Sequence, residues 1–320
     1  MVPDETNEAP LLWGDKRYHT WNGHLRRVFG QKVFKVALDG GFTCPNRDGK
    51  VAIGGCTFCS ARGSGDFAGN RRDDLLKQFH EVKDRMHNKW PEAKYLGYFQ
   101  AFTGTYAPVD VLREMYELIL EQDGVVGLNI ATRPDCLPDD VVDYLAELNR
   151  RTYLWIELGL QTIHEKTSVL INRGHDTDCF LEAVHKLREH GIRVCAHIIH
   201  GLPGETEEMM LQTVSACAGM DIQGIKIHLL HLLKKTPMAK LYESGSLKLM
   251  EKEQYVRLVA DSLELLPPDV IIHRLTGDGP PDLLIGPKWS LKKWEVLNAI
   301  DDELKQRNSW QGKKAKSRWQ

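Results

Sequence analysis

Short apolar runs alternate along this chain with longer segments in which apolar residues recur every three or four positions. The short runs are apolar on both faces, which is typical of parallel strands covered by helices, and the longer segments have the period of amphipathic helices. We expect strands at 33–38, 95–102, 126–131, 153–160, 192–199 and 224–230, with a further candidate at 269–273. We expect helices at 73–88, 108–121, 138–149, 163–171, 178–190, 205–219, 251–265 and 289–305.

This regular order of strands and helices predicts an α/β fold in which right-handed βαβ units build a parallel sheet. Six such units are too few for an eight-stranded barrel, so we expect a partial (β/α)6 parallel barrel with added N- and C-terminal elements. We divide the chain into an N-terminal basic extension at 1–30, a barrel core at 31–275, and a C-terminal helix and basic tail at 276–320 that pack on the core.

The composition is that of an ordinary globular protein, with 42% hydrophobic and 27% charged residues in a chain of 320. No apolar run reaches the roughly 18 residues of a membrane-spanning helix, so no membrane partner is expected. The first residues are polar and acidic, which argues against a signal peptide and favours a cytoplasmic location. Thiols stay reduced there, so clustered cysteines are better interpreted as metal ligands than as disulfides.

Positive charge gathers at both ends of the chain, although the formal net charge is only −2. Residues 13–35 contain six Lys or Arg and one acid, and residues 305–320 contain six Lys or Arg, two tryptophans and no acid. Basic ends on a near-neutral body favour a polyanionic partner such as RNA. The alternative for the tail is a solvated chain end.

Cys44, Cys56 and Cys59 are the most specific chemical signal, in a glycine-rich segment just after the first expected strand. A structural zinc site needs four protein ligands, and an ordinary iron–sulfur cluster needs four thiolates. Three thiolates therefore suggest a [4Fe–4S] cluster with one iron left open for a small molecule. Phe58, directly before the last cysteine, adds an aromatic wall to this segment.

Polar residues also follow the other expected strands, and parallel sheets place their sites at the carboxyl ends of strands. Thr103, Gly104 and Thr105 offer two hydroxyls suited to an amine or a carboxylate, or else form only a capped turn. Glu157 lies within an apolar strand, where an acid is costly unless it is paired. Cys136 follows the third strand and is either a substrate-facing thiol or a small buried hydrophobe.

Histidines at positions 197, 200, 228 and 231 raise the alternative of a zinc site. Because side chains alternate along a strand, residues 197 and 200 point to opposite faces and do not readily converge on one ion. Hydrogen-bonded histidines in the core or at the barrel mouth are therefore the better interpretation.

The spacing C-x11-C-x2-C with Phe58, on a loop after the first strand of a parallel barrel, resembles radical S-adenosylmethionine (SAM) enzymes. The spacing is longer than their commonest form and is similar to the branch that contains the catalytic subunit of elongator. The segments LDGGFTCPNRDG, YFQAFTGTYAP, IATRPDCLPD, IELGLQT, HIIHGLPGET and KIHLLHLLKKTP resemble the bacterial YhcC/YtqA-type, or MnmL-like, subfamily over roughly residues 15–300. The fold implied by this resemblance is the partial barrel of the radical SAM type.

The resemblance implies two cofactors, a [4Fe–4S] cluster held by Cys44, Cys56 and Cys59 and a SAM molecule chelated by the open iron. It implies reductive cleavage of SAM to a 5′-deoxyadenosyl radical, with electrons from a reductase, a flavodoxin or a ferredoxin. The residues expected to contact SAM are Phe58, then Thr103, Gly104 and Thr105 in place of a GGE-type motif, and Gln161, Arg173, Ile199, Leu202 and His231. Cys136 is the candidate catalytic residue.

The substrate implied by the resemblance is tRNA, at a wobble uridine whose 5-substituent is remodelled from a carboxymethylaminomethyl to an aminomethyl group. The basic ends of the chain agree with such a partner, because phosphate neutralisation needs Lys and Arg. Two alternatives stay open: a radical SAM enzyme that acts on a small metabolite, and a non-catalytic iron–sulfur or zinc-binding protein.

Overall fold

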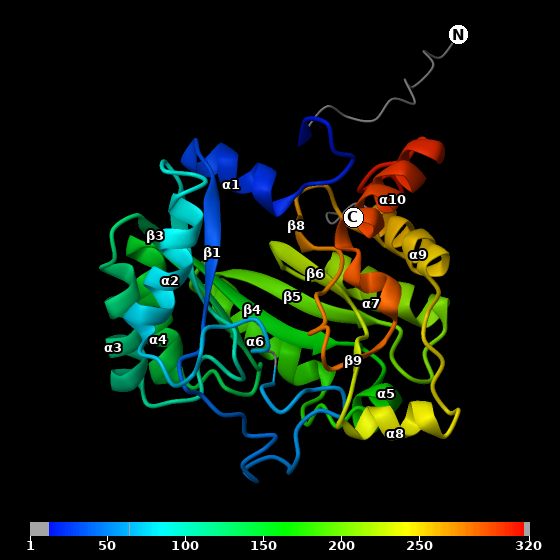
Figure 1. Ribbon diagram of the computed structural model, residues 1–320, viewed down its shortest axis with the longest axis horizontal. Helices are drawn as coiled ribbons and strands as arrows, with labels where there is room; N and C mark the ends of the chain where they lie inside the picture. Colours follow the sequence, from blue (N-terminus) through cyan, green and yellow to red (C-terminus); the bar gives the residue numbers. More distant parts are fainter. Residues whose placement is uncertain (1–12, 64, 317–320) are drawn as a thin grey trace.

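The computed structural model describes residues 13–63 and 65–316. Its main sheet has the order β1–β2–β3–β4–β5–β6–β8, and every pair of neighbours in it is parallel (Figure 1). The strands of this sheet are β1 (Val33–Leu38), β2 (Lys94–Phe99), β3 (Val125–Thr132), β4 (Tyr153–Gln161), β5 (Arg193–His200), β6 (Gly224–Leu229) and β8 (Ile271–Arg274). A separate antiparallel pair consists of β7 (Leu232–Leu233) and β9 (Leu284–Gly286).

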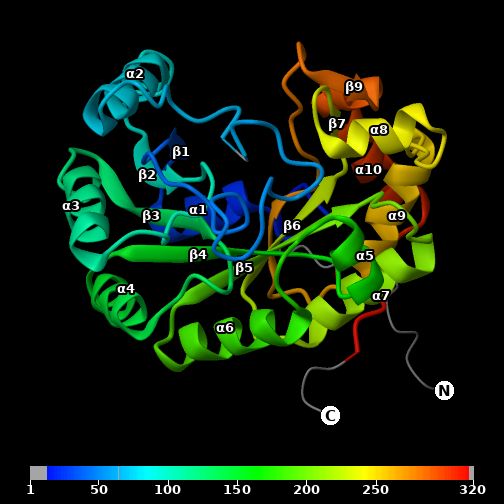
Figure 2. The same cartoon turned by 90° about the horizontal axis from the view of Figure 1, so that it is seen from below.

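Helices follow the strands in the expected alternation. They are α1 (Trp21–Phe29), α2 (Leu75–His87), α3 (Val109–Leu120), α4 (Asp139–Arg151), α5 (Glu165–Leu170), α6 (Thr177–Glu189), α7 (Glu207–Gly219), α8 (Pro237–Glu243), α9 (Lys252–Leu265) and α10 (Lys293–Gln306), with a 3₁₀ turn η2 (Lys288–Leu291). Figure 2 shows α2, α3, α4, α6 and α7 arranged outside the curled sheet, and these helices and the strands enclose one large apolar core.

The predicted partial α/β barrel is confirmed, and β8 is a seventh parallel strand of its sheet. The strands are buried on both faces, as their continuous apolar runs indicate: in β2, every residue after Lys94 is buried. Of the helices in the described part of the chain, none has the length and apolar character needed to cross a bilayer.

Helix α1 is not evident from the apolar pattern, because Leu25 is its one fully buried residue. Its start is nevertheless marked by Thr20, whose Oγ1 accepts a hydrogen bond of 3.1 Å from the backbone N–H of Gly23. Its end is marked by Gly30 at φ 71°. Thr20 also bridges to Ile272 in β8, so α1 lies across the amino-terminal end of the barrel, opposite the cysteine segment (Figure 1).

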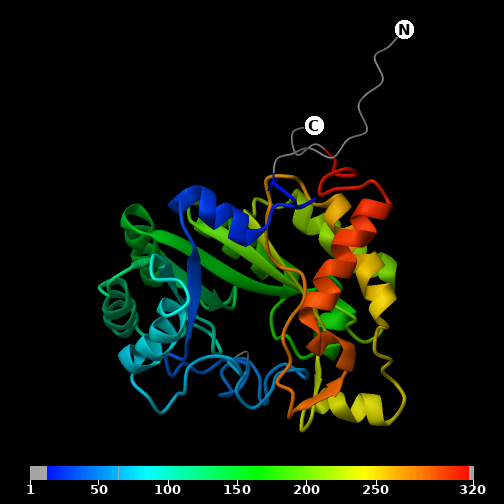
Figure 3. The same cartoon turned by 45° about the horizontal axis from the view of Figure 1, so that its top comes forward.

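The segment after α10 returns to this amino-terminal end, where Gln311 is fully buried. Its side-chain amide donates to the carbonyl oxygens of Pro267 (2.6 Å) and Val270 (2.8 Å), and its Oε1 accepts from the backbone N–H of His19 (2.8 Å). One side chain thus joins the N-terminal segment, the loop before β8 and the C-terminal segment. Figure 3 shows α10 alongside α9, which it contacts.

Many of the basic residues at the two ends are bound within the protein. Ion pairs or hydrogen bonds tie Lys16 to Asp301, Arg17 to the carbonyl of Ser309, Arg307 to Asp261 and Glu303, and Lys314 to Glu264. The ion pairs of Lys16, Arg307 and Lys314 neutralise positive charge that we had attributed to contact with RNA. Residues 1–12 of the expected N-terminal extension, and Arg318 and Trp319 of the tail, lie outside the described residues.

We expect Gln311→Ala to lower the free energy of unfolding by about 2–4 kcal/mol, because it leaves two buried carbonyls and one buried N–H without partners. Urea denaturation followed by circular dichroism measures the change. Gln306→Ala, at an exposed position on α10, is the matched control and should change stability by less than about 0.5 kcal/mol. Equal effects of the two substitutions would contradict the clamping role of Gln311.

Candidate active site inside the barrel

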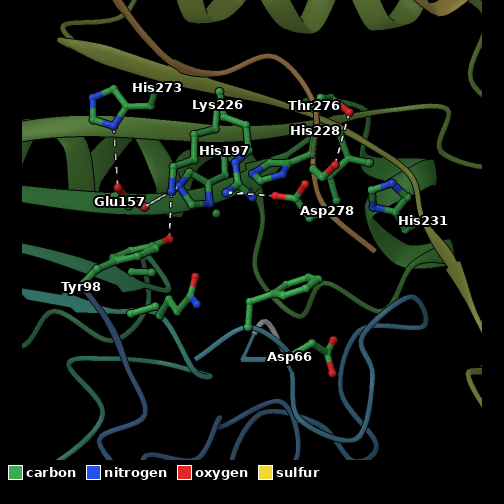
Figure 4. A pocket seen from close by; sticks show the side chains of 18 of the residues that line it. Asp66, Tyr98, Glu157, His197, Lys226, His228, His231, His273, Thr276 and Asp278 are labelled. Atoms are coloured by element: carbon green, nitrogen blue, oxygen red, sulfur yellow. Dashed lines mark hydrogen bonds and ion pairs between the residues drawn. The ribbon is translucent and has the colours of Figure 1, made fainter. Parts of the chain in front are cut away.

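One cavity of about 890 Å³ occupies the barrel interior. Cys44, Cys56 and Cys59 line it at the carboxyl-terminal mouth, and Trp21 and Leu25 from the α1 region line its other end. Figure 4 shows polar side chains that project into it from several strands. The interior of this barrel is therefore an open cavity with polar side chains among its apolar lining residues.

The cysteine segment is anchored to the turn between α5 and α6. Asn46 Nδ2 donates to the carbonyl of Asn172 at 2.6 Å and lies 3.6 Å from Cys56 Sγ. Asn172 Nδ2 returns a hydrogen bond of 2.8 Å to the carbonyl of Gly55, and the backbone N–H of Thr57 donates to Ile171 at 2.9 Å. These bonds fix the backbone on both sides of Cys56.

The environment of Cys56 favours a thiolate. A hydrogen bond from Cys59, opposed by burial and assisted by Arg133 and Asn46, lowers the pKa of the Cys56 thiol to about 7. Arg133 is itself oriented by Asp135, with hydrogen bonds of 2.8 Å from both Nε and Nη2 to the carboxylate. A thiolate is the form that ligates metal, so this end of the cavity suits an iron ligand.

The donor set at this end fits an iron–sulfur cluster with three protein ligands. Within residues 13–63 and 65–316, no three histidine, cysteine or acidic side chains converge as ligands of a single metal ion. The three thiols line one end of the cavity, and a hydrogen bond to Cys56, followed by burial, raises the pKa of Cys59. Soft sulfur ligands on a polynuclear cluster each take a separate iron, so this arrangement suits a cluster.

Three of the four histidines considered as zinc ligands have hydrogen-bond partners, and the ring of the fourth, His228, lies 5.2 Å from that of His197. His200 is 1% exposed and hydrogen-bonds Ser262 Oγ at 3.0 Å, and His231 Nε2 bonds Ser290 Oγ at 3.0 Å. His197 lines the cavity and bonds Glu157 at 3.1 Å. The structure therefore agrees with hydrogen-bonded core and mouth histidines.

A β-bulge at the end of β4 aims Gln161 into the cavity. The bulge lies between Gly159 and Gln161 in the pairing with β5, and Gln161 has φ 61°, which is uncommon for a residue with a Cβ. A Cβ at Gly159 would lie 2.4 Å from Gln161 Nε2, so glycine makes room for the side chain. Gln161 Oε1 is buried and has no hydrogen-bond partner among the described residues.

Arg173 stabilises this bulge. Its guanidinium donates to the carbonyls of Leu160 (2.6 Å), Thr162 (2.5 Å) and His175 (2.8 Å), and the side chain is 1% exposed. Arg173 lines the cavity, but most of its donors serve backbone carbonyls. Arg173 thus holds the backbone on both sides of Gln161, and its contact with SAM stays a prediction.

Of the predicted trio after β2, only Thr103 lines the cavity, and its Oγ1 is buried without a partner in the described part of the chain. Thr105 is turned away: its Oγ1 bonds Thr132 Oγ1 and the carbonyl of Cys136, each at 2.5 Å. Gly104 donates to the carbonyl of Ala131 at 2.8 Å, and a Cβ there would lie 2.8 Å from the same oxygen. Gly104 and Thr105 thus connect two loops structurally.

Phe58, Ile199 and His231 line the cavity, as a binding role requires. Leu202 does not face it: the side chain is 2% exposed and packs in a small apolar cluster with Ile171. The direct SAM contact predicted for Leu202 is therefore corrected to a packing role.

Cys136 is likewise outside the cavity lining, and it is 5% exposed. Burial first, and then the neighbouring Asp135 carboxylate, raise the pKa of its thiol. The buried-hydrophobe alternative therefore applies to Cys136, and the prediction of a substrate-facing thiol is corrected.

The middle of the cavity is organised around Glu157, which is completely buried. We call Glu157 and its neighbours from the other strands the Glu157 layer (Figure 4). Its members are Lys35 of β1 (Nζ to Oε1, 2.7 Å), Tyr98 of β2 (OH to Lys226 Nζ, 2.8 Å), Asn129 of β3 (Nδ2 to Oε1, 2.9 Å), His197 of β5 (Nε2 to Oε2, 3.1 Å), Lys226 of β6 (Nζ to Oε2) and His273 of β8 (Nδ1 to Oε1, 3.7 Å). Every strand of the main sheet contributes one side chain.

Burial alone would raise the pKa of the Glu157 carboxyl, but Lys226 and Lys35 together hold it well below its usual range. Burial lowers the pKa of Lys226 to about 8 and that of His197 to about 4. Burial also lowers the pKa of His273 well below its usual range. At neutral pH the layer therefore contains one carboxylate, two ammonium groups and neutral histidines.

Glu157 is recognisable from the sequence as a buried acid that needs a partner, but its partners are not. Lys35 in VFKVAL and Lys226 in GIKIHL are the corresponding signals, since each is a lone cation within an apolar strand. A charge at such a position must find an opposite charge or a ligand. The three charged strand residues together could have indicated one shared interior site.

The comparisons with known proteins agree with this geometry. The model of the Radical SAM superfamily matches residues 44–217, and the model of the Radical_SAM C-terminal domain matches residues 222–306. YtqA of Bacillus subtilis (strain 168) is 66% identical over 309 residues, which cover 97% of this chain and 96% of YtqA. Protein YhcC of Escherichia coli (strain K12) is 41% identical over 290 residues, which cover 90% of this chain and 93% of YhcC.

A solved structure of Elp3 from the archaeon Methanocaldococcus infernus has a similar fold, with a TM-score of 0.63 at 17% identity. The match covers 85% of this chain, which spans only 63% of the Elp3 chain. Human Elongator complex protein 3 is 28% identical over 163 residues, which cover 50% of this chain and 29% of the human protein. The chain belongs to the radical SAM superfamily, whose cofactors are a [4Fe–4S] cluster and SAM, and it is a relative of YtqA and YhcC.

Proposed function

We propose that this protein is a radical SAM enzyme that remodels the 5-substituent of a tRNA wobble uridine, from a carboxymethylaminomethyl to an aminomethyl group. The observation that supports it most is the continuity of the cavity, which joins the three thiols at the mouth to the cationic Glu157 layer inside. An enzyme that modifies a substituent needs a continuous cavity of this kind. The reacting atom must be held next to the cofactor while other side chains of the same cavity bind the substrate.

When bound, the cluster and SAM supply a hydrogen-abstracting radical through reductive cleavage of SAM. The protein holds and shields these groups. Cys44, Cys56 and Cys59 would ligate the cluster, and the unpaired Thr103 Oγ1 and Gln161 Oε1 would orient polar groups of SAM. At the other end, Trp21 and Leu25 of α1 line the cavity, so this end is covered by the helix.

Two observations support tRNA as the substrate class. A protein of Methanocaldococcus infernus named tRNA uridine(34) acetyltransferase is 24% identical over 163 residues, which cover 50% of this chain and 30% of that protein. The cavity mouth is also cationic: residues 47–72 contain five Lys or Arg and two Asp, and residues 231–250 contain four Lys and one Glu. The two segments meet where the backbone N–H of Met238 donates to Thr57 at 3.1 Å.

The exposed side chains of this mouth suit a nucleic acid. Phe67 is 53% exposed and Ile53 82% exposed beside the cationic residues, and an exposed aromatic ring offers a stacking surface for a base. Lys50 lies over the ring of Tyr106, and Arg62 donates to the carbonyl of Gly69, so neither contact neutralises the positive charge. An unneutralised cation is what a phosphate contact requires. The mouth, rather than the chain ends, is the better candidate for tRNA contact.

We expect Cys56→Ala to remove the cluster and abolish SAM cleavage, because one iron loses its thiolate. Anaerobic reconstitution measures iron and sulfide content and absorbance, and a dithionite assay measures cleavage of SAM. Cys179→Ala, a cysteine outside the segment, is the matched control and should retain both. Full iron content and activity in Cys56→Ala would show that the ligand assignment is wrong.

We expect tRNA from a strain that lacks this protein to accumulate the carboxymethylaminomethyl uridine and to lose its aminomethyl derivatives. Mass spectrometry of digested nucleosides measures both. Complementation with the wild-type protein should restore the profile, and complementation with Cys56→Ala should not. An unchanged profile would contradict the tRNA substrate and favour a small metabolite.

We expect the triple variant Lys50→Ala, Arg62→Ala, Arg72→Ala to weaken tRNA binding. For each phosphate that the variant no longer neutralises, the slope of log affinity against log salt concentration should become shallower by about one. Gel shifts over a series of salt concentrations measure this slope. The triple variant Lys305→Ala, Lys313→Ala, Lys316→Ala removes the same charge from the C-terminal end and should bind almost as the wild type does. If the C-terminal variant lost more tRNA affinity than the variant at the mouth, the contact with tRNA would lie at the chain end.

A further inference from the structure

The Glu157 layer carries one more positive charge than negative charge. Lys35 and Lys226 share the single Glu157 carboxylate, and their side chains are only 18% and 6% exposed. His197 and His273 add no charge at neutral pH, since burial lowers the pKa of each. An unbalanced buried cation is costly, so a layer built in this way is completed by an anion.

The cavity gives such an anion access to Lys226. This ammonium group has three N–H donors, and the described residues provide two acceptors, Glu157 Oε2 and the hydroxyl of Tyr98. Lys226, Lys35 and His228 all line the cavity, and His228 lies two residues beyond Lys226 toward the mouth. A ligand that enters from the mouth therefore meets a donor that is still available.

The layer is too deep to be part of the SAM pocket at the mouth. Along β4, Gln161 lies four residue steps beyond Glu157, which in a regular parallel strand would be roughly 13 Å. The cysteines, Thr103 and Gln161 lie at the mouth, whereas Lys226 lies a strand's depth inside.

We propose that Lys226, supported by Lys35, binds the carboxylate of the substrate, so that the Glu157 layer is an anion-recognition subsite at the base of the cavity. This inference rests on the proposed function, in which the 5-substituent of the uridine ends in a carboxylate. The carboxylate would hydrogen-bond the remaining donor of Lys226 and balance the charge of the layer. The acid end of the substituent would point inward, with its carbon and nitrogen atoms nearer the mouth.

The charge of the layer favours a carboxylate over a phosphate. A carboxylate has one negative charge, which matches the single excess positive charge, whereas a phosphate group would bring up to two. Arg274 and Lys293 surround Asp278 nearer the mouth, but their side chains are 37% and 35% exposed, so solvent screens this second cationic group. The deep subsite is therefore the one with strong preference for a buried monoanion.

The test compares binding of two tRNAs that differ only in the carboxymethyl part of the substituent, one with carboxymethylaminomethyl uridine and one with aminomethyl uridine. We expect the wild type to prefer the acid-bearing tRNA by about ten- to a hundredfold, the strength of a charge-assisted hydrogen bond. Lys226→Met, which removes the charge and keeps the side-chain length, should abolish this preference and retain the binding common to both tRNAs. Lys32→Met, at another cavity lysine that bonds Asn22, is the matched control and should keep the preference.

Glu157→Gln should change the preference for the acid-bearing tRNA in the opposite direction. It removes the internal competitor for the two ammonium groups, so the preference for the acid-bearing tRNA should increase. If this variant does not fold, Lys226→Met and Lys32→Met decide the question alone, with circular dichroism as the check on folding. Retained preference in folded Lys226→Met would overturn the subsite.

A second probe separates this inference from the proposed function. Calorimetric titration with the free nucleosides, carboxymethylaminomethyl uridine and aminomethyl uridine, reports the subsite without the tRNA body. Binding of the acid nucleoside that needs Lys226, with no binding of tRNA, would support the subsite and contradict the tRNA substrate. Binding of tRNA without discrimination between the two substituents, in the wild type, would support the substrate class and overturn the subsite.

Discussion

The fold depends on a single buried carboxylate. Glu157 is completely buried at the centre of the barrel, and each of the other six strands of the main sheet supplies one polar side chain to it or to its immediate neighbours. Removing one partner of a buried ion pair typically costs about 3–5 kcal/mol, so the arrangement tolerates little error. Side chains alternate along a strand, so a slip of one residue in any strand would turn its contribution away from Glu157. The carboxylate therefore links the registers of the whole sheet.

The helices outside the sheet explain why the interior of this barrel can remain an open cavity. Its outward strand residues pack against the helices in a continuous apolar core, which supplies most of the burial. The interior can then carry charge, because stability does not depend on filling it. At the mouth, the bulge after Gly159 and the guanidinium of Arg173 fix the position of Gln161, as the strands fix the position of Glu157 inside. The cavity therefore has two rigid sites. The cysteines and Gln161 lie at the mouth, and the Glu157 layer lies inside.

The architecture was predictable from the sequence because its signals are local. Apolar runs and helical periods located the strands of the main sheet to within a few residues, and the three-cysteine spacing indicated the cluster. Other features depend on pairing between distant residues, which periodicity does not contain. Thr105 faces a neighbouring loop, Leu202 packs in a core, and Cys136 is buried, although each follows a strand at the expected place. Lys35 and Lys226 were visible as isolated cations, but their meeting at Glu157 requires the barrel.

The charges at the chain ends show why net charge along a sequence is a weak guide to a partner. Lys16, Arg307 and Lys314 each pair with an acid of α9 or α10, so their charge already stabilises the fold. A phosphate that approached them would have to displace that acid, and the exchange of one anion for another gains little. Lys50 and Arg62 contact a ring and a carbonyl, and among the described residues no ion pair is found for either, so a phosphate there would not have to displace an acid. Cationic residues follow the cysteine segment in the sequence and recur in the Glu157 layer, so the field inside the cavity would favour an anion over a cation.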